Sequence, residues 1–269
     1  PNITHTMNKL EDQLHCVLFI RSNRGVTLTP EGENLYARIS SAAVQIQDAE
    51  EVLSASASLS HGAISISATE TALNIYLSER LRGFHAQYPG IRLRITNHST
   101  LQAVQAVKNG EVDFAVVTTP AETGSDLKRV ALMPFNEILV GGPSFAELAG
   151  RTLALQALTA YPLIMLENGS MSRIFYRQFF LEHNAELKPD IEAGTTDQML
   201  TLVRSDLGLA FVPEPMARGN LHRKRILQMN LQEAIPSRSV CLVYDPRRPL
   251  NTAAREFRHQ LLESAKNKQ

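Results

Sequence analysis

Short β-prone runs and amphipathic helical stretches alternate through most of the chain, and this alternation constrains the fold more than any other feature. Residues 64–67 form a β-prone run, a helical stripe follows as far as Pro89-Gly90, and residues 91–95 alternate with period two. After a helical stretch closed by Asn109-Gly110, residues 112–117 have the composition of a buried strand. This order is typical of a parallel sheet with right-handed crossovers.

The same alternation recurs further along the chain. Residues 163–166, 190–193 and 207–212 are β-prone, and helical patterns at 172–183 and 197–204 separate them. A last strand at 239–244 and a last helix at 251–265 are expected to return to the first unit. We therefore predict an α/β fold with two lobes within residues 62–269. Lobe 1 would comprise about 62–140 and 237–269, and lobe 2 about 141–236.

A long amphipathic helix is expected within residues 33–61. Its apolar and small residues recur at alternating spacings of four and three, which is the pattern of a narrow coiled-coil seam. The seam residues are Leu35, Ile39, Ala42, Ile46, Ala49 and Leu53. Packing against the helix's own domain would cover this seam, but the regular alternation favours a homodimer formed by two copies of the helix.

Composition excludes several classes of protein. Lys plus Arg and Asp plus Glu each number 27, so a wholly basic nucleic-acid coat is excluded, although a local basic patch is not. The two cysteines, Cys16 and Cys241, lack metal-site spacing and fit a reducing compartment. We predict no cofactor and no metal. No apolar run approaches the roughly 18 residues of a membrane helix, and no leader is visible, so we expect a cytoplasmic protein without a membrane partner.

Hydroxyl side chains follow the predicted strands in both lobes. Open parallel sheets bind ligands at the carboxyl ends of their strands, where helix N-termini offer free N–H groups. One such cluster would be only a helix cap, but several at strand ends suggest a small polar ligand between the lobes. The candidate effector-binding residues are Thr69, Thr71, Ser99, Thr100, Thr118, Thr195 and Thr196. Glu70 counts against a purely anionic ligand unless it caps its own helix.

Catalytic signatures are not found in the sequence. It contains no G-x-G-x-x-G, no phosphate-binding G-x-x-x-x-G-K-[ST], no H-E-x-x-H and no G-x-S-x-G. The eight histidines are scattered and lack partners at ligand spacing. Nothing therefore favours an enzyme.

The opening segment carries features that suit contact with DNA. A predicted helix presents a polar face that could reach base edges in a major groove. The residues of this face are Asn2, Thr4, His5, Asn8 and Lys9. The following hairpin carries Arg21 and Arg24, which suit phosphate or minor-groove contacts. An ordinary amphipathic helix and a basic turn would give the same pattern, so these residues alone leave the choice open.

The order of motifs closely resembles that of the LysR-type transcriptional regulators. The resemblance begins with PNITHTMNKLEDQL at residues 1–14 and continues with Leu18-Phe19-x-Arg21-x-x-Arg24-Gly25-Val26-x-Leu28-Thr29-x-x-Gly32. Tyr88-Pro89-Gly90-Ile91-x-Leu93, the run GEVDFA at 110–115 and the run LGLAFVP at 207–213 follow in the family's order. The resemblance therefore covers essentially the whole chain.

This resemblance implies an effector-responsive regulator that binds double-stranded operator DNA as a homodimer or homotetramer. Residues 1–32 would form a truncated winged helix-turn-helix that starts at the recognition helix, and 33–61 the linker and dimerisation helix. Residues 62–269 would form a periplasmic-binding-protein-like effector domain that binds a small polar, anionic metabolite. The implied base-facing residues are Asn2, Thr4 and His5, while Arg21 and Arg24 would serve the wing. A solute-binding protein and an enzyme that uses the cleft are the alternatives.

Two positions depart from the family's pattern. His15 stands where the family usually has Gly, and Asp206 stands where a small residue or Gly is common. His tolerates left-handed backbone better than most residues but worse than Gly, so the turn before the hairpin is expected to differ locally.

Overall fold

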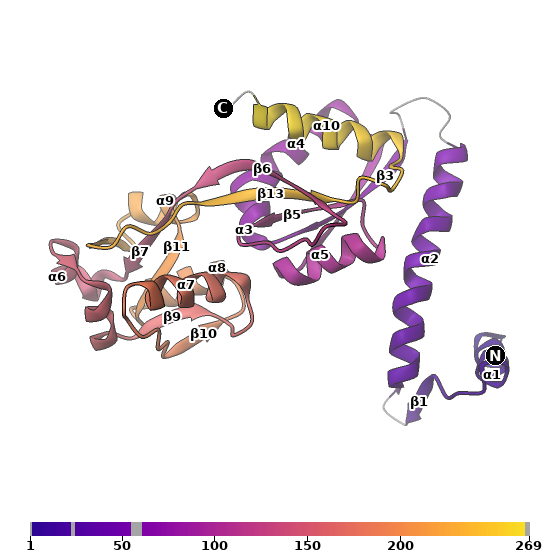
Figure 1. The fold of residues 1–269 in the computed structure, drawn as a ribbon, viewed down its shortest axis with the longest axis horizontal. Helices are drawn as coiled ribbons and strands as arrows, with labels where there is room; N and C mark the ends of the chain where they lie inside the picture. Colours follow the sequence, from indigo (N-terminus) through magenta and orange to yellow (C-terminus); the bar gives the residue numbers. More distant parts are fainter. Residues whose placement is uncertain (1, 23–24, 55–60, 267–269) are drawn as a thin grey trace.

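A computed structural model describes residues 2–22, 25–54 and 61–266 of the chain (Figure 1). The helical elements are α1 (Asn2–Leu14), α2 (Pro30–Ser54), α3 (Glu70–Ala72), η1 (Leu73–Leu77), α4 (Ser78–Gln87), α5 (Thr100–Asn109), η2 (Pro143–Phe145), α6 (Ala146–Ala149), η3 (Leu155–Ala160), α7 (Met171–Glu182), α8 (Thr196–Arg204), α9 (Glu214–His222) and α10 (Thr252–Lys266). The strands are β1 (Phe19–Ser22), β2 (Gly25–Leu28), β3 (Gly62–Ala68), β4 (Ile91–Asn97), β5 (Phe114–Thr118), β6 (Lys128–Phe135), β7 (Glu137–Gly141), β8 (Thr152–Leu153), β9 (Leu163–Leu166), β10 (Ile191–Ala193), β11 (Leu209–Pro213), β12 (Leu227–Leu231) and β13 (Arg238–Tyr244).

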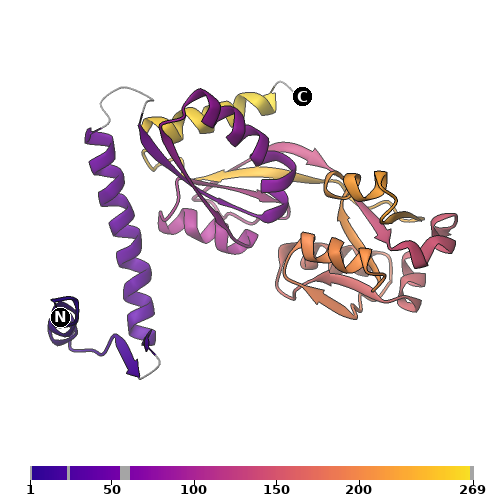
Figure 2. The same cartoon turned by 180° about the vertical axis from the view of Figure 1, so that it is seen from behind.

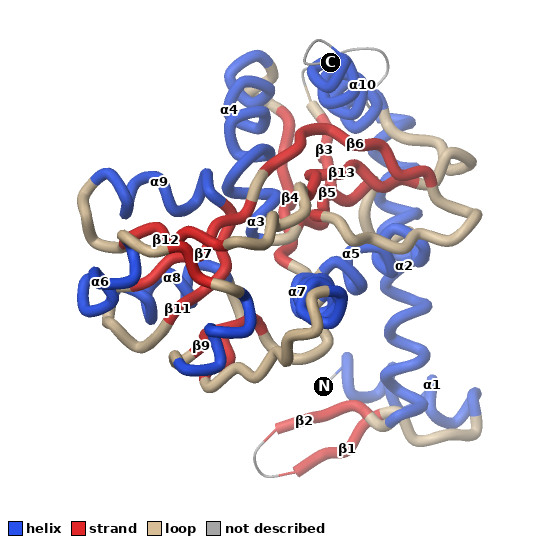
Figure 3. The backbone as a smooth tube through the Cα atoms, turned by 60° about the vertical axis from the view of Figure 1, so that its left-hand side comes forward, coloured by secondary structure: helices blue, strands red, loops and turns tan. Residues whose placement is uncertain are grey.

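Hydrogen bonds to the backbone around Leu18 join the N-terminal helix to the hairpin. The Glu11 carboxylate accepts hydrogen bonds from the amides of Leu18 and Phe19 at 2.6 and 3.0 Å, and the Thr29 amide donates to the Leu18 carbonyl at 3.0 Å. A Cβ atom on Gly32 would lie only 2.2 Å from that carbonyl oxygen, so the start of α2 packs against the backbone of Leu18. This contact fixes the antiparallel β1–β2 hairpin at the foot of α2 (Figure 3).

The long helix α2 runs beside lobe 1 and carries α1 and the hairpin at its far end (Figures 1 and 2). It begins at Pro30, where Thr29 Oγ1 accepts from the Gly32 amide at 3.0 Å. Thr followed by Pro is a strong helix-start signal because the hydroxyl satisfies an unpaired N–H and Pro needs none. Further along, the Ser41 hydroxyl donates to the carbonyl of Asn109 in lobe 1.

Lobe 1 is built on a five-stranded sheet in the order β4-β3-β5-β13-β6. β3 pairs in parallel with β4 and β5, and β13 pairs antiparallel with β5 and β6. Side chains along β5 alternate between two apolar clusters, as the period of a strand requires. Phe114 and Val116 join Tyr76 of η1 and Phe257 of α10, whereas Val117 packs on the opposite face, which α5 covers. Both faces of the sheet are therefore buried.

Lobe 2 repeats this layered arrangement around a six-stranded sheet in the order β10-β9-β11-β7-β12-β8. On one face Met165 and Phe211 pack against Tyr176 and Phe180 of α7. On the other face the cluster includes Ile164 and Val212 of the sheet with residues of α8 and α9. The expected two-lobed α/β fold is therefore present.

The chain passes between the lobes twice, at β6–β7 and at β12–β13. Residues up to about 140 were expected in lobe 1, but β7 at Glu137–Gly141 pairs with β11 and β12 of the lobe 2 sheet. The first crossing therefore lies at Asn136, because the strand-like run of 128–141 is divided between two sheets. The return crossing precedes Arg238, close to the expected position.

The two departures from the family pattern both adopt left-handed backbone, with φ of 53° at His15 and 60° at Asp206. Asp206 is held there because its Oδ1 accepts from the amide and the hydroxyl of Ser144, each at 2.8 Å.

Within the described residues no helix is long and apolar enough to cross a bilayer.

Candidate effector cleft and DNA-binding surface

A cavity of about 300 Å³ lies between the two lobes. All seven hydroxyl residues predicted from the sequence line it, and they come from four separate segments of the chain. They are Thr69, Thr71, Ser99, Thr100, Thr118, Thr195 and Thr196. The strand-end reasoning therefore placed these residues together correctly, although their role in binding stays a prediction.

Three of the seven residues are also helix caps. Thr69 Oγ1 accepts from the Ala72 amide, Ser99 forms a capping box with Gln102, and Thr195 Oγ1 accepts from the Gln198 amide. Ser170, which also lines the cavity, caps α7 in the same way. Several helix N-termini therefore converge on this cavity, which favours ligand groups that accept hydrogen bonds.

A buried guanidinium lies at the deep end of the cavity. Arg238, which is 3% exposed, lines a small recess that shares Thr71, Ser172 and Thr196 with the cavity. Its Nη2 donates to Thr118 Oγ1 of lobe 1 at 3.2 Å and to Ser172 Oγ of lobe 2 at 3.0 Å. Its Nε donates to the Thr119 carbonyl at 2.6 Å. Arg238 therefore connects both lobes beneath the cavity.

The charge of Arg238 is balanced by Glu137, the first residue of β7. Nη1 of Arg238 donates to one carboxylate oxygen of Glu137, and the Tyr176 hydroxyl donates to the other. Burial, followed by the Glu137 charge, raises the pKa of Tyr176 well above its ordinary value. Arg238, Glu137 and Ser172 were not predicted from the sequence as site residues. Both charged residues sit at strand starts that look ordinary in sequence, and no local signal marks their pairing.

Glu70 occupies a position that the sequence left open. Its carboxylate accepts from the Thr196 amide at 2.7 Å and from the Asp197 amide at 3.3 Å, so it caps α8 of lobe 2 rather than its own helix. Burial raises the pKa of Glu70, the Thr196 N–H lowers it, and the charge of Asp197 raises it again. The described residues that line the cavity include two glutamates, Glu70 and Glu167, and no Asp, Lys or Arg.

The predicted DNA-contacting residues of α1 are exposed where the structure describes them. Thr4, His5, Asn8 and Lys9 all lie on the accessible surface of the helix. The side chains of Asn2 and Arg21, and the whole of Arg24, lie outside the described residues. The four described residues thus occupy a surface that a DNA groove could reach.

The apolar seam of α2 is exposed in the single chain. Ile39 is 49% exposed and Ile46 is 62% exposed, while Ala42 is exposed and Leu35 is half-buried. The side chains of Ala49 and Leu53 lie outside the described residues. Lobe 1 of the same chain therefore leaves most of the described seam uncovered.

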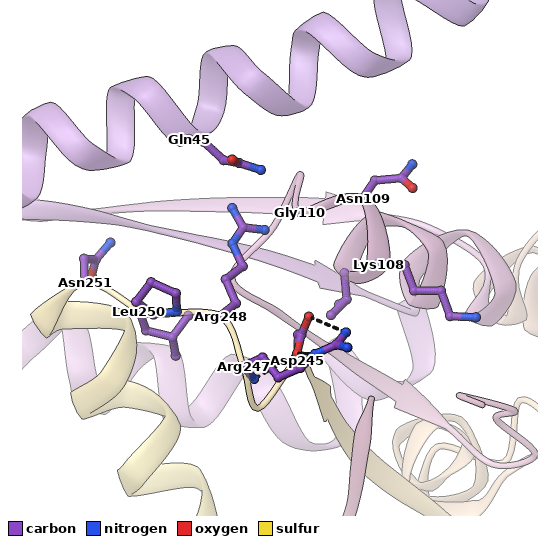
Figure 4. Close-up of a pocket in the computed structure, with 11 residues that line it drawn as sticks. Gln45, Lys108, Asn109, Gly110, Asp245, Arg247, Arg248, Leu250 and Asn251 are labelled. Atoms are coloured by element: carbon purple, nitrogen blue, oxygen red, sulfur yellow. Dashed lines mark hydrogen bonds and ion pairs between the residues drawn. The ribbon is translucent and has the colours of Figure 1, made fainter. Parts of the chain in front are cut away.

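A second cavity of about 610 Å³ lies where α2 meets lobe 1. Figure 4 shows Gln45 of α2 facing Arg248, which extends past Gly110, while Arg247 turns toward Asp245. The Arg247 Nε and Asp245 Oδ1 atoms are 3.1 Å apart. Sequence reasoning gave no sign of this cavity, because its walls come from distant segments. Across the described chain, no group of three or more His, Cys, Asp or Glu residues is arranged to hold a metal ion.

The chain matches two family profiles. The profile of the LysR substrate binding domain matches residues 57–266, and that of the bacterial regulatory helix-turn-helix protein of the lysR family matches residues 1–33. The HTH-type transcriptional regulator YofA of Bacillus velezensis (strain DSM 23117 / BGSC 10A6 / LMG 26770 / FZB42) is 27% identical over 256 residues, covering 95% of this chain and 86% of that protein. This relative is named as a transcriptional regulator rather than as an enzyme.

Solved structures share the fold. The crystal structure of CbnR, a LysR family transcriptional regulator, has a TM-score of 0.75 at 18% identity and covers 98% of this chain and 89% of that one. The effector binding domain of QuiR in complex with shikimate has a TM-score of 0.68 at 20% identity, covering 77% of this chain and 99% of that one. Because the LysR substrate-binding profile alone spans more than half of the sequence, this chain belongs to the LysR family of transcriptional regulators.

Proposed function

We propose that the interlobe cavity binds a small polar, anionic metabolite and that this binding controls how the protein engages operator DNA in the cytoplasm. The observation that carries this proposal is the convergence of hydroxyl residues from both lobes on one cavity. QuiR, which shares the fold, has an effector binding domain that takes shikimate, and this supports a small polar ligand here.

The contacts of Arg238 favour an acceptor group on that ligand. Both Thr118 Oγ1 and Ser172 Oγ accept from the guanidinium, so their own O–H protons are left to donate elsewhere. Within the described residues neither hydroxyl donates to another protein atom. A carboxylate or another anionic group of the effector is the acceptor that suits two such donors beside a cation.

DNA contact is assigned to the α1 surface of Thr4, His5, Asn8 and Lys9, together with Asn2 and the wing residues Arg21 and Arg24. An exposed polar helix face followed by a hairpin suits a recognition helix in a major groove with the wing against the backbone. The match of residues 1–33 to the helix-turn-helix profile supports this assignment.

A homodimer through α2 would bring two such surfaces together. The exposed Ile39 and Ile46 mark the seam that a second copy of the helix would cover. An effector that binds one lobe arrangement more tightly than another would shift the angle at which the paired α2 helices present their α1 surfaces.

The experiment has two steps. Genomic fragments that bind the purified protein are recovered and used in fluorescence-anisotropy titrations, and the small molecule that co-purifies is identified by mass spectrometry. We expect that molecule to change the affinity for DNA. The double variant Thr71→Val and Thr100→Val should bind the molecule at least tenfold more weakly while keeping its affinity for DNA.

A matched variant is Thr123→Val, which removes a hydroxyl from lobe 1 outside the cavity. It should bind the small molecule as the parent does. Equal ligand affinity in the double variant and the parent would show that the site lies elsewhere. If the affinity for DNA is the same with and without the small molecule, the cavity does not control DNA binding.

A further inference from the structure

The amides of Thr196, Asp197 and Gln198, which begin α8, all have acceptors. The first four N–H groups of an α-helix have no partner within the helix, so each needs an outside acceptor. The Gln198 amide donates to Thr195 Oγ1 at 3.2 Å, and the helix's own hydrogen bonds begin with the Met199 amide, which donates to the carbonyl of the cap residue Thr195 at 3.1 Å. The Thr196 and Asp197 amides, which come first, donate to the carboxylate of Glu70.

The acceptor for these two amides comes from the opposite lobe. Glu70 begins α3 in lobe 1, whereas Thr196 and Asp197 begin α8 in lobe 2. The neighbouring hydroxyls of Thr71 and Thr196 also meet across the cleft at 3.4 Å. The helix that contains Glu70 has its own cap in Thr69, so the carboxylate is not needed there. Glu70 therefore serves the contact between the lobes.

The position that Glu70 occupies suits an anion. A helix N-terminus carries about half a positive charge, and its free N–H groups point at whatever lies there. The carboxylate of a metabolite would form the same two hydrogen bonds that Glu70 forms. The same cavity wall contributes Thr195 and Thr196, so a ligand in the cavity reaches this helix end.

We propose that Glu70 is a tethered anion that competes with anionic ligands for the N-terminus of α8 and holds the two lobes together while it is bound there. An anionic group reaches this position only by exchange with Glu70. That exchange breaks the two bonds that Glu70 makes across the cleft, so occupation of the α8 N-terminus by a ligand is converted into a change of lobe angle. This inference rests on the proposed effector cleft and specifies how it is regulated.

Inorganic phosphate tests the competition directly. The Thr196 and Asp197 amide resonances of the full chain are followed by NMR while phosphate replaces chloride at constant ionic strength. In Glu70→Ala the vacated helix end should give saturable shifts with an apparent affinity at least tenfold tighter than in the parent. Glu70→Gln, which keeps an acceptor oxygen but loses the charge, should lie between them.

Glu122→Gln is the matched control, because it removes an exposed carboxylate from lobe 1 outside the cavity. It should titrate like the parent. Shifts of equal size and midpoint in the parent and in Glu70→Ala would overturn the competition. A uniform response of all amides would do the same, since it would show only general ion binding.

Distances between the lobes test the second half of the inference. Spin labels at Arg92 of β4 and Leu181 of α7, both exposed, report the lobe separation in a Cys16→Ser background. Labelled chains are diluted with unlabelled chains so that only distances within one chain contribute. Glu70→Ala should broaden and lengthen the distribution, whereas Glu122→Gln should leave it unchanged. A distribution identical to the parent's would show that Glu70 does not hold the lobes.

These outcomes separate this inference from the proposed function. If Glu70→Ala behaves like the parent in both experiments but the co-purifying molecule still alters DNA affinity, only the role of Glu70 fails. If that molecule binds outside the cavity, the effector cleft itself fails, whatever Glu70 does. Circular dichroism of each variant confirms that a change reflects the cleft rather than loss of the fold.

Discussion

Arg238 Nη2 lies 3.0 Å from Ser172 Oγ, so the first residue of β13 contacts the second residue of α7. The same nitrogen donates to Thr118 of the other lobe, and the guanidinium packs over the rings of Phe135 and Phe175. One cation thus joins the two lobes at the point where the chain crosses between them.

Replacing Arg238 should destabilise the protein strongly. Arg238→Ala leaves the Glu137 carboxylate buried without its cation, and breaking a buried ion pair on one side costs about 3–5 kcal/mol. Urea unfolding followed by circular dichroism measures this loss. The comparison variant Arg218→Ala removes an exposed pair with Glu214 and should cost at most about 1 kcal/mol. Similar losses in the two variants would contradict the importance of the buried pair.

Asp206 should tolerate only a substitution that keeps both its backbone geometry and its acceptor. Asp206→Ala puts a side chain that has no hydrogen-bond acceptor at a φ near 60° and removes the bonds to Ser144. We therefore expect the free energy of unfolding to fall by about 1–3 kcal/mol. Asp206→Asn keeps an acceptor oxygen and a residue that accepts left-handed backbone. It should unfold within about 0.5 kcal/mol of the parent. Thermal unfolding of the two variants side by side decides between these outcomes.

A charge in the α2 seam should weaken self-association. Ile46→Asp places a carboxylate on the apolar stripe, so the dissociation constant of the dimer should rise at least tenfold in sedimentation equilibrium. Ala37→Asp puts the same charge on an exposed position outside the seam and should leave the dissociation constant unchanged. If both variants sediment like the parent, the dimer is formed by another surface.

Lys9 is not among the three residues implied to face bases, so we expect it to contact phosphate, and its loss should weaken DNA binding without changing the preferred sequence. A lysine that contacts phosphate releases about one counterion, so Lys9→Ala should reduce the slope of log affinity against log salt by about 1. Anisotropy titrations at several salt concentrations give this slope. Lys188→Ala removes an exposed lysine from lobe 2 and should keep the parental slope. An unchanged slope in Lys9→Ala would place the phosphate contacts elsewhere.

Features that depend on local chain geometry could be predicted from the sequence. The hydroxyls at strand ends were placed together correctly because parallel strands bring their carboxyl ends to one edge of the sheet. The alternating spacings of four and three between Leu35 and Leu53 predicted a long helix there, and α2 spans Pro30–Ser54. Each of these predictions needs only a few neighbouring residues.

Features that depend on pairing between distant segments could not be predicted. Glu70 meets Thr196 across 126 positions of sequence, and Glu137 meets Arg238 across 101. A carboxylate at the start of a helix normally suggests a cap for that helix, so the partner of Glu70 could be seen only once the lobes were in place. The crossing at Asn136 was displaced for a similar reason, since only Asn136 separates β6 from β7 and only the pairing of β7 with distant strands assigns it to lobe 2.

The chain crosses between the lobes twice, and both crossings join lobe 2 to lobe 1. Lobe 2 is inserted into lobe 1, and both the helix that leads to the DNA-contacting segment and the last helix of the chain adjoin lobe 1 (Figure 2). Rotation of lobe 2 therefore does not act directly on the far end of α2. If the cavity controls DNA binding as proposed, the five-stranded sheet of lobe 1 and the hydrogen bond from Ser41 to Asn109 lie on the path between the cavity and α1.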